Sequence, residues 1–539
     1  MVVWTDMNSQ GENIAIEIVE TVKNQMNFPD DAYIFRANFT SFLPTDIQEA
    51  FTNLIHKPNE YLSLSVDALS TIDLKTQSAF SRYLTTELLQ KIPELASSMN
   101  QITYHPMQTA ILAMVVEREE RSKIFTPQQY FIINILIKQS KVGFRTHELK
   151  WKREKVFDKT SVLTIFDEIK QESRAIVSDV DRRQEQLIRP LPLNTNRLMK
   201  VASTKFGMSP FETLKVLENL YLSGHISYYL TESTSYGKDF KFEDILSAHQ
   251  LHSEWGQYTL KLIDKGFDKP DIDESSKSLP IVPVKSAERG KLQNQEWKVY
   301  QFITKSFLAS ISHHAVLNIQ NVVFNIGDEL FTLNARNIEA KGFLEITPWL
   351  NNIDEIEFEK FKTLEEYKID TTKIIDSKTS AVGLLTEAEL VNQMESYNIG
   401  HNGQLAEHLK ALVDQEYIKI NKKSRIITST KAGSSLVKAL NEVDRDLISP
   451  SIRRKVEEYC HQISFNEVES SEVVTTVLNT YKQKLDYLQT NIDKVVDIFK
   501  HEMVGRARSE SELSYQKQDT NNSNKNGAET KAGEIDSET

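Results

Sequence analysis

The spacing of hydrophobic and polar residues predicts a strand, a loop and a helix at the start of the chain. A short apolar run from Val2 to Trp4 ends at the carboxylate of Asp6, and a helical pattern runs from Ile14 to Val22. One strand with one helix cannot close a core by itself, so this unit is typical of a fragment of a parallel α/β sheet.

A longer segment further along has the outline of a helix-turn-helix or winged-helix module. Thr195 can cap a first helix. Ser209 and Glu212 form a capping box that opens a second helix, which Gly224 ends. The pattern then predicts a short strand over residues 225–230.

The same outline recurs towards the end of the chain. Thr386 and Glu389 form a capping box that opens a helix, and a turn follows over residues 398–403. After another helix, apolar and polar residues alternate over residues 417–428, as in the hairpin of a winged helix. Two such modules favour contact with nucleic acid, although the same arrangement also serves as plain structural packing.

Length, charge and cysteine content narrow the class of protein. At about 150 residues per domain, 539 residues suggest three or four domains, and 40% apolar with 26% charged residues is typical of a globular chain. The net charge of -12 requires any nucleic acid to bind in local basic grooves. The single cysteine, Cys460, excludes an internal disulfide and a zinc ribbon, and no apolar run is long enough for a membrane span.

Few residues suggest chemistry by spacing alone. His401 and His408 have no carboxylate or cysteine at ligand spacing, so we expect no zinc site. Neither GxxxxGK[ST] nor GxGxxG occurs, which argues against a nucleotide-driven motor. Asp6 beyond a strand end is a possible metal ligand. Tyr228 is a possible nucleophile if its phenolate is favoured, but most tyrosines in such a strand are core residues.

Five motifs occur along the chain in a defined order. They are Trp4-Thr5-Asp6 with Gly11-Glu12-Asn13, Ile72-Asp73-Leu74 with Ala79-Phe80-Ser81-Arg82, Tyr104 with Gln108, Leu191-Pro192-Leu193-Asn194-Thr195 with Ile226-Ser227-Tyr228 and Thr231-Glu232-Ser233, and Ile399-Gly400 with Ala406-Glu407-His408. In this order they resemble the motifs of type IA DNA topoisomerases, closest to the topoisomerase III branch. The resemblance spans about Val2 to Lys500.

The resemblance implies a multidomain α+β fold, a toroid with a partial Toprim α/β remnant, β-rich gate arms and winged-helix-like helical domains. The implied ranges are 1–43 for the partial Toprim domain, 44–99 and 383–500 for the helical base, 100–188 and 312–375 for the gate, 189–311 for the nucleophile or lid domain, and 505–539 for a disordered tail. The tail is also expected from its polar composition.

The activity that the resemblance implies is ATP-independent cleavage of one DNA strand, strand passage and religation, which relaxes or decatenates DNA in recombination and repair. Tyr228 would attack a phosphodiester and hold the 5′ end as a phosphotyrosine ester. Mg²⁺ would be held by Asp6 and Glu12 in a degraded site, without zinc. Single-stranded DNA would contact Arg82, Gln108, Asn194, Thr231 and Ser233.

The resemblance also suggests partners and a location. A RecQ-type helicase or an accessory protein would be a partner besides single-stranded DNA, and no membrane is involved. The protein would work in the nucleus of a eukaryote, or otherwise in the cytoplasm with the nucleoid.

Three departures from the family pattern fall in the implied active centre. Leu230 stands where the family has an arginine, and losing one charged donor costs about 2.7 to 4 kcal/mol of transition-state stabilisation. Asn8 replaces the second Toprim aspartate, and the first Toprim glutamate would precede Met1. These departures favour an alternative, a catalytically inactive paralogue that binds single-stranded DNA or a partner as a scaffold. For an active ring, Leu230→Arg together with Asn8→Asp should raise cleavage.

Overall fold

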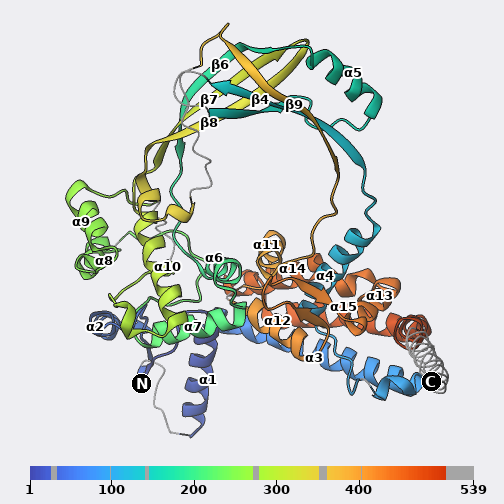
Figure 1. Ribbon diagram of the computed structural model, residues 1–539. Coiled ribbons are helices and arrows are strands. Elements are labelled where there is room, and N and C mark those ends of the chain that lie inside the picture. Colours follow the sequence, from blue (N-terminus) through green and yellow to red (C-terminus); the bar gives the residue numbers. More distant parts are fainter. Residues whose placement is uncertain are drawn as a thin grey trace, which may run out of the picture.

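The structure, a computed structural model, describes residues 1–25, 33–97, 99–139, 145–238, 240–270, 278–350, 361–401 and 403–505. Its elements form a ring, with a group of helices at one side and a β-barrel at the opposite side (Figure 1). The predicted multidomain α+β toroid is confirmed. The predicted tail lies outside the described residues from position 506 onward. Within the described ranges, no helix combines the length and apolar character needed to cross a bilayer.

The N-terminal segment forms a small sheet with a helix packed on it. Its elements are β1 (Val2–Val3), α1 (Ser9–Gln25), β2 (Phe35–Arg36), α2 (Pro44–Thr52) and β3 (Ile55–His56). β2 lies between the other strands, parallel to β1 and antiparallel to β3. Ala15 and Val19 of α1 pack on Val3 and Ile34. The predicted strand, loop and helix are confirmed, and β2 and β3 supply the neighbours that one strand requires.

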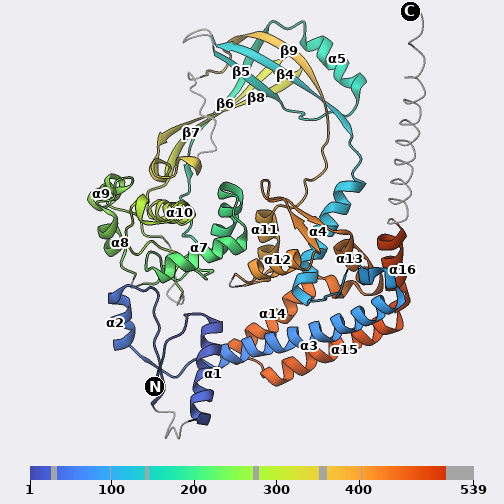
Figure 2. The ribbon, with the colours of Figure 1, turned by 60° about the horizontal axis from the view of Figure 1, so that its bottom comes forward.

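The helical base surrounds the long helix α3. Its elements are α3 (Glu60–Lys91), η2 (Pro93–Ser97), α4 (Pro106–Ile124), α11 (Glu387–Tyr397), α12 (Gln404–Asp414), β10 (Ile418–Ile420), β11 (Ile427–Ser429), α13 (Lys431–Val443), η7 (Arg445–Ile448), α14 (Pro450–Ser464), α15 (Ser470–Thr490), α16 (Ile492–Phe499) and η8 (Lys500–Gly505). α3 begins where the Asn59 side chain accepts from two backbone N–H groups. Figure 2 shows α15 running along α3.

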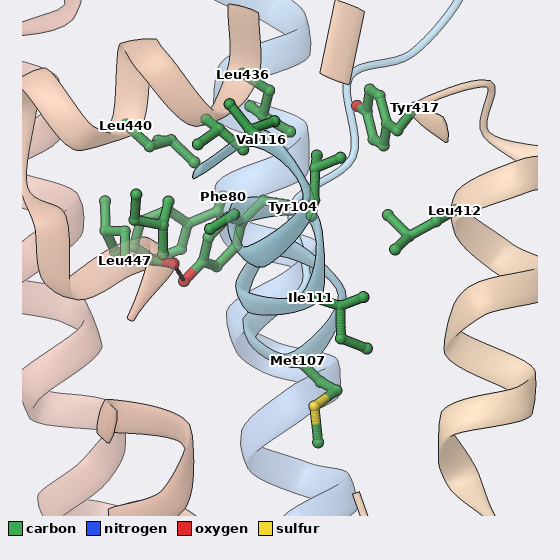
Figure 3. Packing of buried hydrophobic residues seen from close by; sticks show 14 of the residues in the cluster. Phe80, Tyr104, Met107, Ile111, Val116, Leu412, Tyr417, Leu436, Leu440 and Leu447 are labelled. Carbon is green, nitrogen blue, oxygen red and sulfur yellow. Dashed lines mark hydrogen bonds between the residues drawn. The ribbon is translucent and has the colours of Figure 1, made fainter. Parts of the chain in front are cut away.

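Buried aromatic and aliphatic side chains hold the base together. Figure 3 shows Phe80 of α3 beside Tyr104, whose hydroxyl donates to the carbonyl of Leu447 at 3.0 Å. Side chains from α4, α12 and α13 complete this core. The second predicted module is confirmed, because Thr386 and Glu389 form both bonds of a capping box and β10 pairs antiparallel with β11.

The gate is one closed barrel. Its elements are β4 (Gln129–Gln139), β5 (Arg145–Trp151), α5 (Lys159–Ile169), β6 (Arg174–Leu187), β7 (Ala315–Ile326), β8 (Glu329–Ala340) and β9 (Glu366–Lys378). The strand order is β4-β5-β8-β7-β6-β9. Inward side chains such as Ile133, Val177 and Phe324 fill the interior, so the barrel is a packed core rather than a channel.

The nucleophile segment packs short helices around a core of its own. Its elements are α6 (Thr195–Val201), the π-helix η3 (Ala202–Phe206), α7 (Pro210–Leu222), α8 (Phe242–His249), α9 (Gly256–Lys265), η4 (Arg289–Lys291), α10 (Asn294–Ser310), η5 (Gly342–Glu345) and η6 (Pro348–Leu350). The capping box of Ser209 and Glu212 is confirmed. The predicted cap of α6 is wrong, because Asn194 rather than Thr195 accepts the N–H of Arg197.

The predicted strand over residues 225–230 is also wrong, because these residues form bends and irregular backbone. The N–H of Ser227 donates to the carbonyl of Val282, whereas the N–H of Tyr228 donates to that of Thr40. Successive residues thus bond to different neighbours on two sides, and no regular ladder forms.

The cores do not follow the implied domain ranges. Met107 and Ile111 of α4 lie in the base core, although the range 100–188 assigns them to the gate. Phe39 and Ala50 of the N-terminal segment lie in the core of the nucleophile segment. The N-terminal segment therefore packs directly against the elements that carry Tyr228.

Candidate active site

Tyr228 lies where the N-terminal segment meets the nucleophile segment. Its backbone N–H donates to the carbonyl of Thr40 at 2.8 Å, and its ring contacts those of Tyr221 and Tyr229. Only 7% of the residue is exposed. Burial raises the pKa of the Tyr228 phenol well above its usual value, the carboxylate of Asp6 and the neighbouring tyrosines add to this rise, and a hydrogen bond from Asn8 opposes it.

Asn8 makes the polar contact to the phenolic oxygen. Its Nδ2 lies 2.5 Å from Tyr228 Oη, and its Oδ1 accepts the N–H of Gly11 at 2.6 Å. The second contact is that of an N-cap, since α1 begins at Ser9 and Gly11 is its third residue. The loop from β1 to α1 therefore points a hydrogen-bond donor at Tyr228.

Glu12 and Arg36 hold this loop in place. One carboxylate oxygen of Glu12 accepts from Arg36 Nε at 2.9 Å, and the other accepts from the N–H of Asn59 at 2.7 Å. Arg36, 1% exposed, also donates to the carbonyl of Asp6 at 2.8 Å. Both oxygens of Glu12 are thus committed to structural contacts.

The residues present do not fit the implied Mg²⁺ site. Glu12 accepts from Arg36, and the carboxamide of Asn8 accepts from Gly11 and donates to Tyr228. Asp6 contributes a single carboxyl, whose pKa is raised by desolvation against the opposing effect of Arg36, and further raised by Glu218. In the described part of the chain, three or more His, Cys, Asp or Glu side chains nowhere gather in a metal-binding group. Mg²⁺ is usually held by one or two ionised carboxylates together with water and substrate phosphates, and this set offers the single carboxyl of Asp6, whose pKa is raised.

Gly11 is required by the close approach of the loop to α1. A Cβ at this position would lie 1.9 Å from the carbonyl oxygen of Asp6, whereas one at Gly290 would meet no atom within 4 Å. We expect Gly11→Ala to force the loop outward and lower the stability by about 1 to 3 kcal/mol. Thermal denaturation of Gly11→Ala, with Gly290→Ala as the matched control, measures this effect. Equal melting temperatures for the two variants would contradict it.

The hydroxyl groups of Thr195 and Ser227 hold the backbone around Tyr228, a role that the sequence did not indicate for either residue. Thr195 Oγ1 donates towards the carbonyls of Tyr229 and Thr231 and accepts the N–H of Thr231 at 2.8 Å. Ser227 Oγ donates to the carbonyl of Pro280 at 3.0 Å and accepts the N–H of Val282 at 2.9 Å. Both lie within the motifs that resemble the nucleophile region, but their partners are distant in sequence.

The predicted DNA-contacting residues fall into two groups. Asn194, Thr231 and Ser233 lie together beside Tyr228, where Asn194 Nδ2 donates to the carbonyl of Glu232 at 3.2 Å and Thr231 Oγ1 accepts the N–H of Ser233 at 3.1 Å. Arg82 and Gln108 lie in the helical base. Arg82 is exposed on α3, and Gln108 is buried on α4, where it accepts from Gln415 at 3.2 Å.

The space next to the phenol is small. A cavity of about 10 Å³ is bordered by Tyr228, Met7, Thr40, Leu230 and Leu279, among others. Such a volume holds about one water molecule and no nucleotide. The side chains that line this cavity therefore have to shift before a phosphodiester can reach the phenolic oxygen.

An ion pair links the nucleophile segment to the helical base close to Tyr228. His401 Nδ1 lies 2.9 Å from Glu232 Oε1, and His401 Nε2 lies 3.7 Å from Glu457. The pair borders a hollow of about 740 Å³ between α1, α3 and α14. The hydrogen bond to Glu232 is the largest cause that raises the pKa of His401, and burial opposes it.

This contact should weaken as the pH rises. The folded-state pKa of His401 lies above its unfolded value of about 6.5, so the ion pair stabilises fully below that pH and is lost as the pH rises through the folded-state pKa. We expect the melting temperature of the wild type to exceed that of His401→Gln at about pH 6. At about pH 9 the two melting temperatures should be equal. Because His401 is 40% exposed, the difference stays below about 1 kcal/mol. A pH-independent difference in melting temperature would refute this role.

Comparisons with known proteins agree with the fold and with the ordered motifs. The family model described as DNA topoisomerase matches residues 57–475. Human DNA topoisomerase 3-beta-1 is 31% identical over 495 residues, which are 91% of this chain and 57% of that protein. DNA topoisomerase 3-beta of Arabidopsis thaliana is 31% identical over 516 residues, 95% of this chain and 58% of that protein. The chain thus spans a little over half the length of these relatives.

A solved structure has the same fold. Full-length topoisomerase I from Thermotoga maritima superposes with a TM-score of 0.73 at 21% identity, covering 89% of this chain and 77% of that one. This likeness accounts for the ring, the barrel and the helical base as one fold. The chain belongs to the DNA topoisomerase family, in the topoisomerase III branch of the type IA enzymes.

Proposed function

We propose that this chain cleaves one strand of DNA with Tyr228, passes another strand through the break and reseals it. The observation that carries the proposal is the placement of the Tyr228 phenolic oxygen, which accepts a hydrogen bond from Asn8, where the N-terminal segment meets the nucleophile segment within a ring. Family membership and the shared motifs around Tyr228 support it.

The chemistry needs only an exchange of esters. Tyr228 Oη forms a bond to phosphorus as the bond from phosphorus to the 3′ oxygen breaks, the phenol loses its proton, and the 3′ oxygen leaves as a hydroxyl after gaining one. The 5′ end stays attached as a phosphotyrosine ester. Resealing reverses these steps, so the bond energy is conserved and ATP is not consumed.

Access of DNA to Tyr228 requires the ring to open where the nucleophile segment contacts the helical base. The contacts that would have to break include the Glu232–His401 pair and the ion pair of Lys200 with Glu395, at 2.8 Å. Both join the nucleophile segment to the helical base. They are exposed in part and individually weak, which suits contacts that form and break repeatedly.

Covalent trapping tests the proposal directly. The full chain is mixed with a single-stranded oligonucleotide labelled at its 3′ end, with and without Mg²⁺, and denatured rapidly. We expect labelled protein, with the label on the peptide that contains Tyr228 by mass spectrometry. Absence of any adduct in both conditions, while the oligonucleotide still binds, would favour the scaffold alternative instead.

Substrate, partner and location remain part of this proposal. We take single-stranded DNA as the substrate, a RecQ-type helicase or accessory protein as the partner, and the compartment that holds the genome as the site of action. Copurification with a tagged chain and imaging of that chain test the last two.

A further inference from the structure

The amide group of Asn8 has a defined orientation. The backbone N–H of Gly11 can only donate, so Asn8 Oδ1 must face it at 2.6 Å. The Nδ2 group therefore faces Tyr228 Oη at 2.5 Å, and the phenolic oxygen is the acceptor of that bond. An aspartate at this position could not donate, and the phenol would have to give its own proton to the carboxylate.

We propose that Asn8 is a second catalytic residue, which donates a hydrogen bond to the reacting oxygen of Tyr228. The inference rests on the proposed function. During resealing the DNA 3′ hydroxyl attacks phosphorus, and the bond to Tyr228 Oη breaks with its electron pair passing to that oxygen. The Asn8 amide stabilises the negative charge that gathers there, and the same transition state is crossed in cleavage.

Other groups around this oxygen do not supply such a donor. The charged group that faces Tyr228 from the loop before α1 is the carboxylate of Asp6, which disfavours negative charge on the phenol. Tyr221 of α7 and the adjacent Tyr229 act in the same direction. Leu230, at the position of the family arginine, lies against Gly403, where a Cβ would come within 2.9 Å of its Cδ2. Asn8 is thus the donor that the structure places on this oxygen.

The hydrogen bond from Asn8 to Tyr228 reverses the effect on cleavage that the sequence suggests for Asn8→Asp. Asn8→Asp keeps the acceptor for the N–H of Gly11, and Asp caps helices as well as Asn, so α1 retains its start. The variant replaces the donor to Tyr228 with a carboxylate, which can only accept and which adds a negative charge beside the phenol. We therefore expect Asn8→Asp to slow cleavage and resealing rather than to restore activity.

The test uses the full chain, a 3′-labelled single-stranded oligonucleotide and two variants. In Asn8→Asp the single-turnover rates of cleavage and resealing should fall together by about 100- to 1,000-fold, while the oligonucleotide concentration for half-maximal binding changes little. Asn24→Asp makes the same chemical change at an exposed position near the other end of α1 and should keep wild-type rates.

A second readout does not depend on cleavage. The ¹³Cζ resonance of Tyr228, assigned by its loss in Tyr228→Phe, reports hydrogen bonding at the phenolic oxygen. It should move in Asn8→Asp and stay in place in Asn24→Asp. An unmoved resonance, or Asn8→Asp rates within about threefold of wild type, would overturn the inference. If the wild-type chain forms no adduct at all, the proposed function fails, whereas the resonance still tests the contact.

Discussion

Tyr228→Phe should eliminate the covalent adduct with single-stranded DNA. Phenylalanine has no oxygen with which to form the phosphate ester, and removal of an attacking hydroxyl lowers the rate of an enzyme by about a million-fold. The ring would still pack against Tyr221 and Tyr229. The hydrogen bond from Asn8 is the principal loss to stability, about 1 kcal/mol, so the variant should fold.

Tyr229→Phe is the matched control for this experiment. Tyr229 is adjacent in sequence, and its ring also contacts Tyr221, but Asn8 points to the oxygen of Tyr228. Labelled adduct should therefore form in Tyr229→Phe and not in Tyr228→Phe, as gel shift and peptide mapping would show. Adduct of equal yield in Tyr228→Phe would mean that another residue attacks the DNA.

Arg453→Met should destabilise the helical base by about 3 to 5 kcal/mol. Arg453 is 2% exposed and donates to Asp73 at 2.5 Å and to Glu457 at 2.7 Å. Methionine fills similar space but leaves two enclosed carboxylates without their cation, which is the costly way to break a buried ion pair. Glu457 also accepts the N–H of Gly400, so the turn before α12 should loosen as well.

Arg454→Met is the surface counterpart of that change. Arg454 follows directly in α14 and pairs with Glu458, but both side chains are about half exposed. Its loss should change the stability by less than about 1 kcal/mol. Denaturant unfolding compares the two variants, and amide hydrogen exchange in α3 and α14 locates the effect. Similar unfolding curves for both variants would show that the contacts of Arg453 with Asp73 and Glu457 contribute little to stability.

Local rules were sufficient for much of the fold. The capping boxes at Ser209 and Thr386, the hairpin of β10 and β11, and the start of α1 all depend on residues within a few positions of one another. The strand predicted over residues 225–230 failed for the opposite reason. Its backbone groups bond to Thr40 and Val282, which no local pattern indicates.

Through the order of the family motifs, the sequence by itself made Tyr228 the candidate nucleophile, because those signals are carried by neighbouring residues. Only the tertiary structure decided what Asn8 and Glu12 do. From the sequence, Asn8 replaces a metal-binding aspartate of the family and Glu12 is a metal ligand that the chain keeps. In the folded chain, Asn8 instead donates to the phenolic oxygen of Tyr228, 220 positions away, and Glu12 accepts from Arg36. The role of a polar side chain depends on which partner lies within about 3 Å of it, and chain folding alone sets that distance.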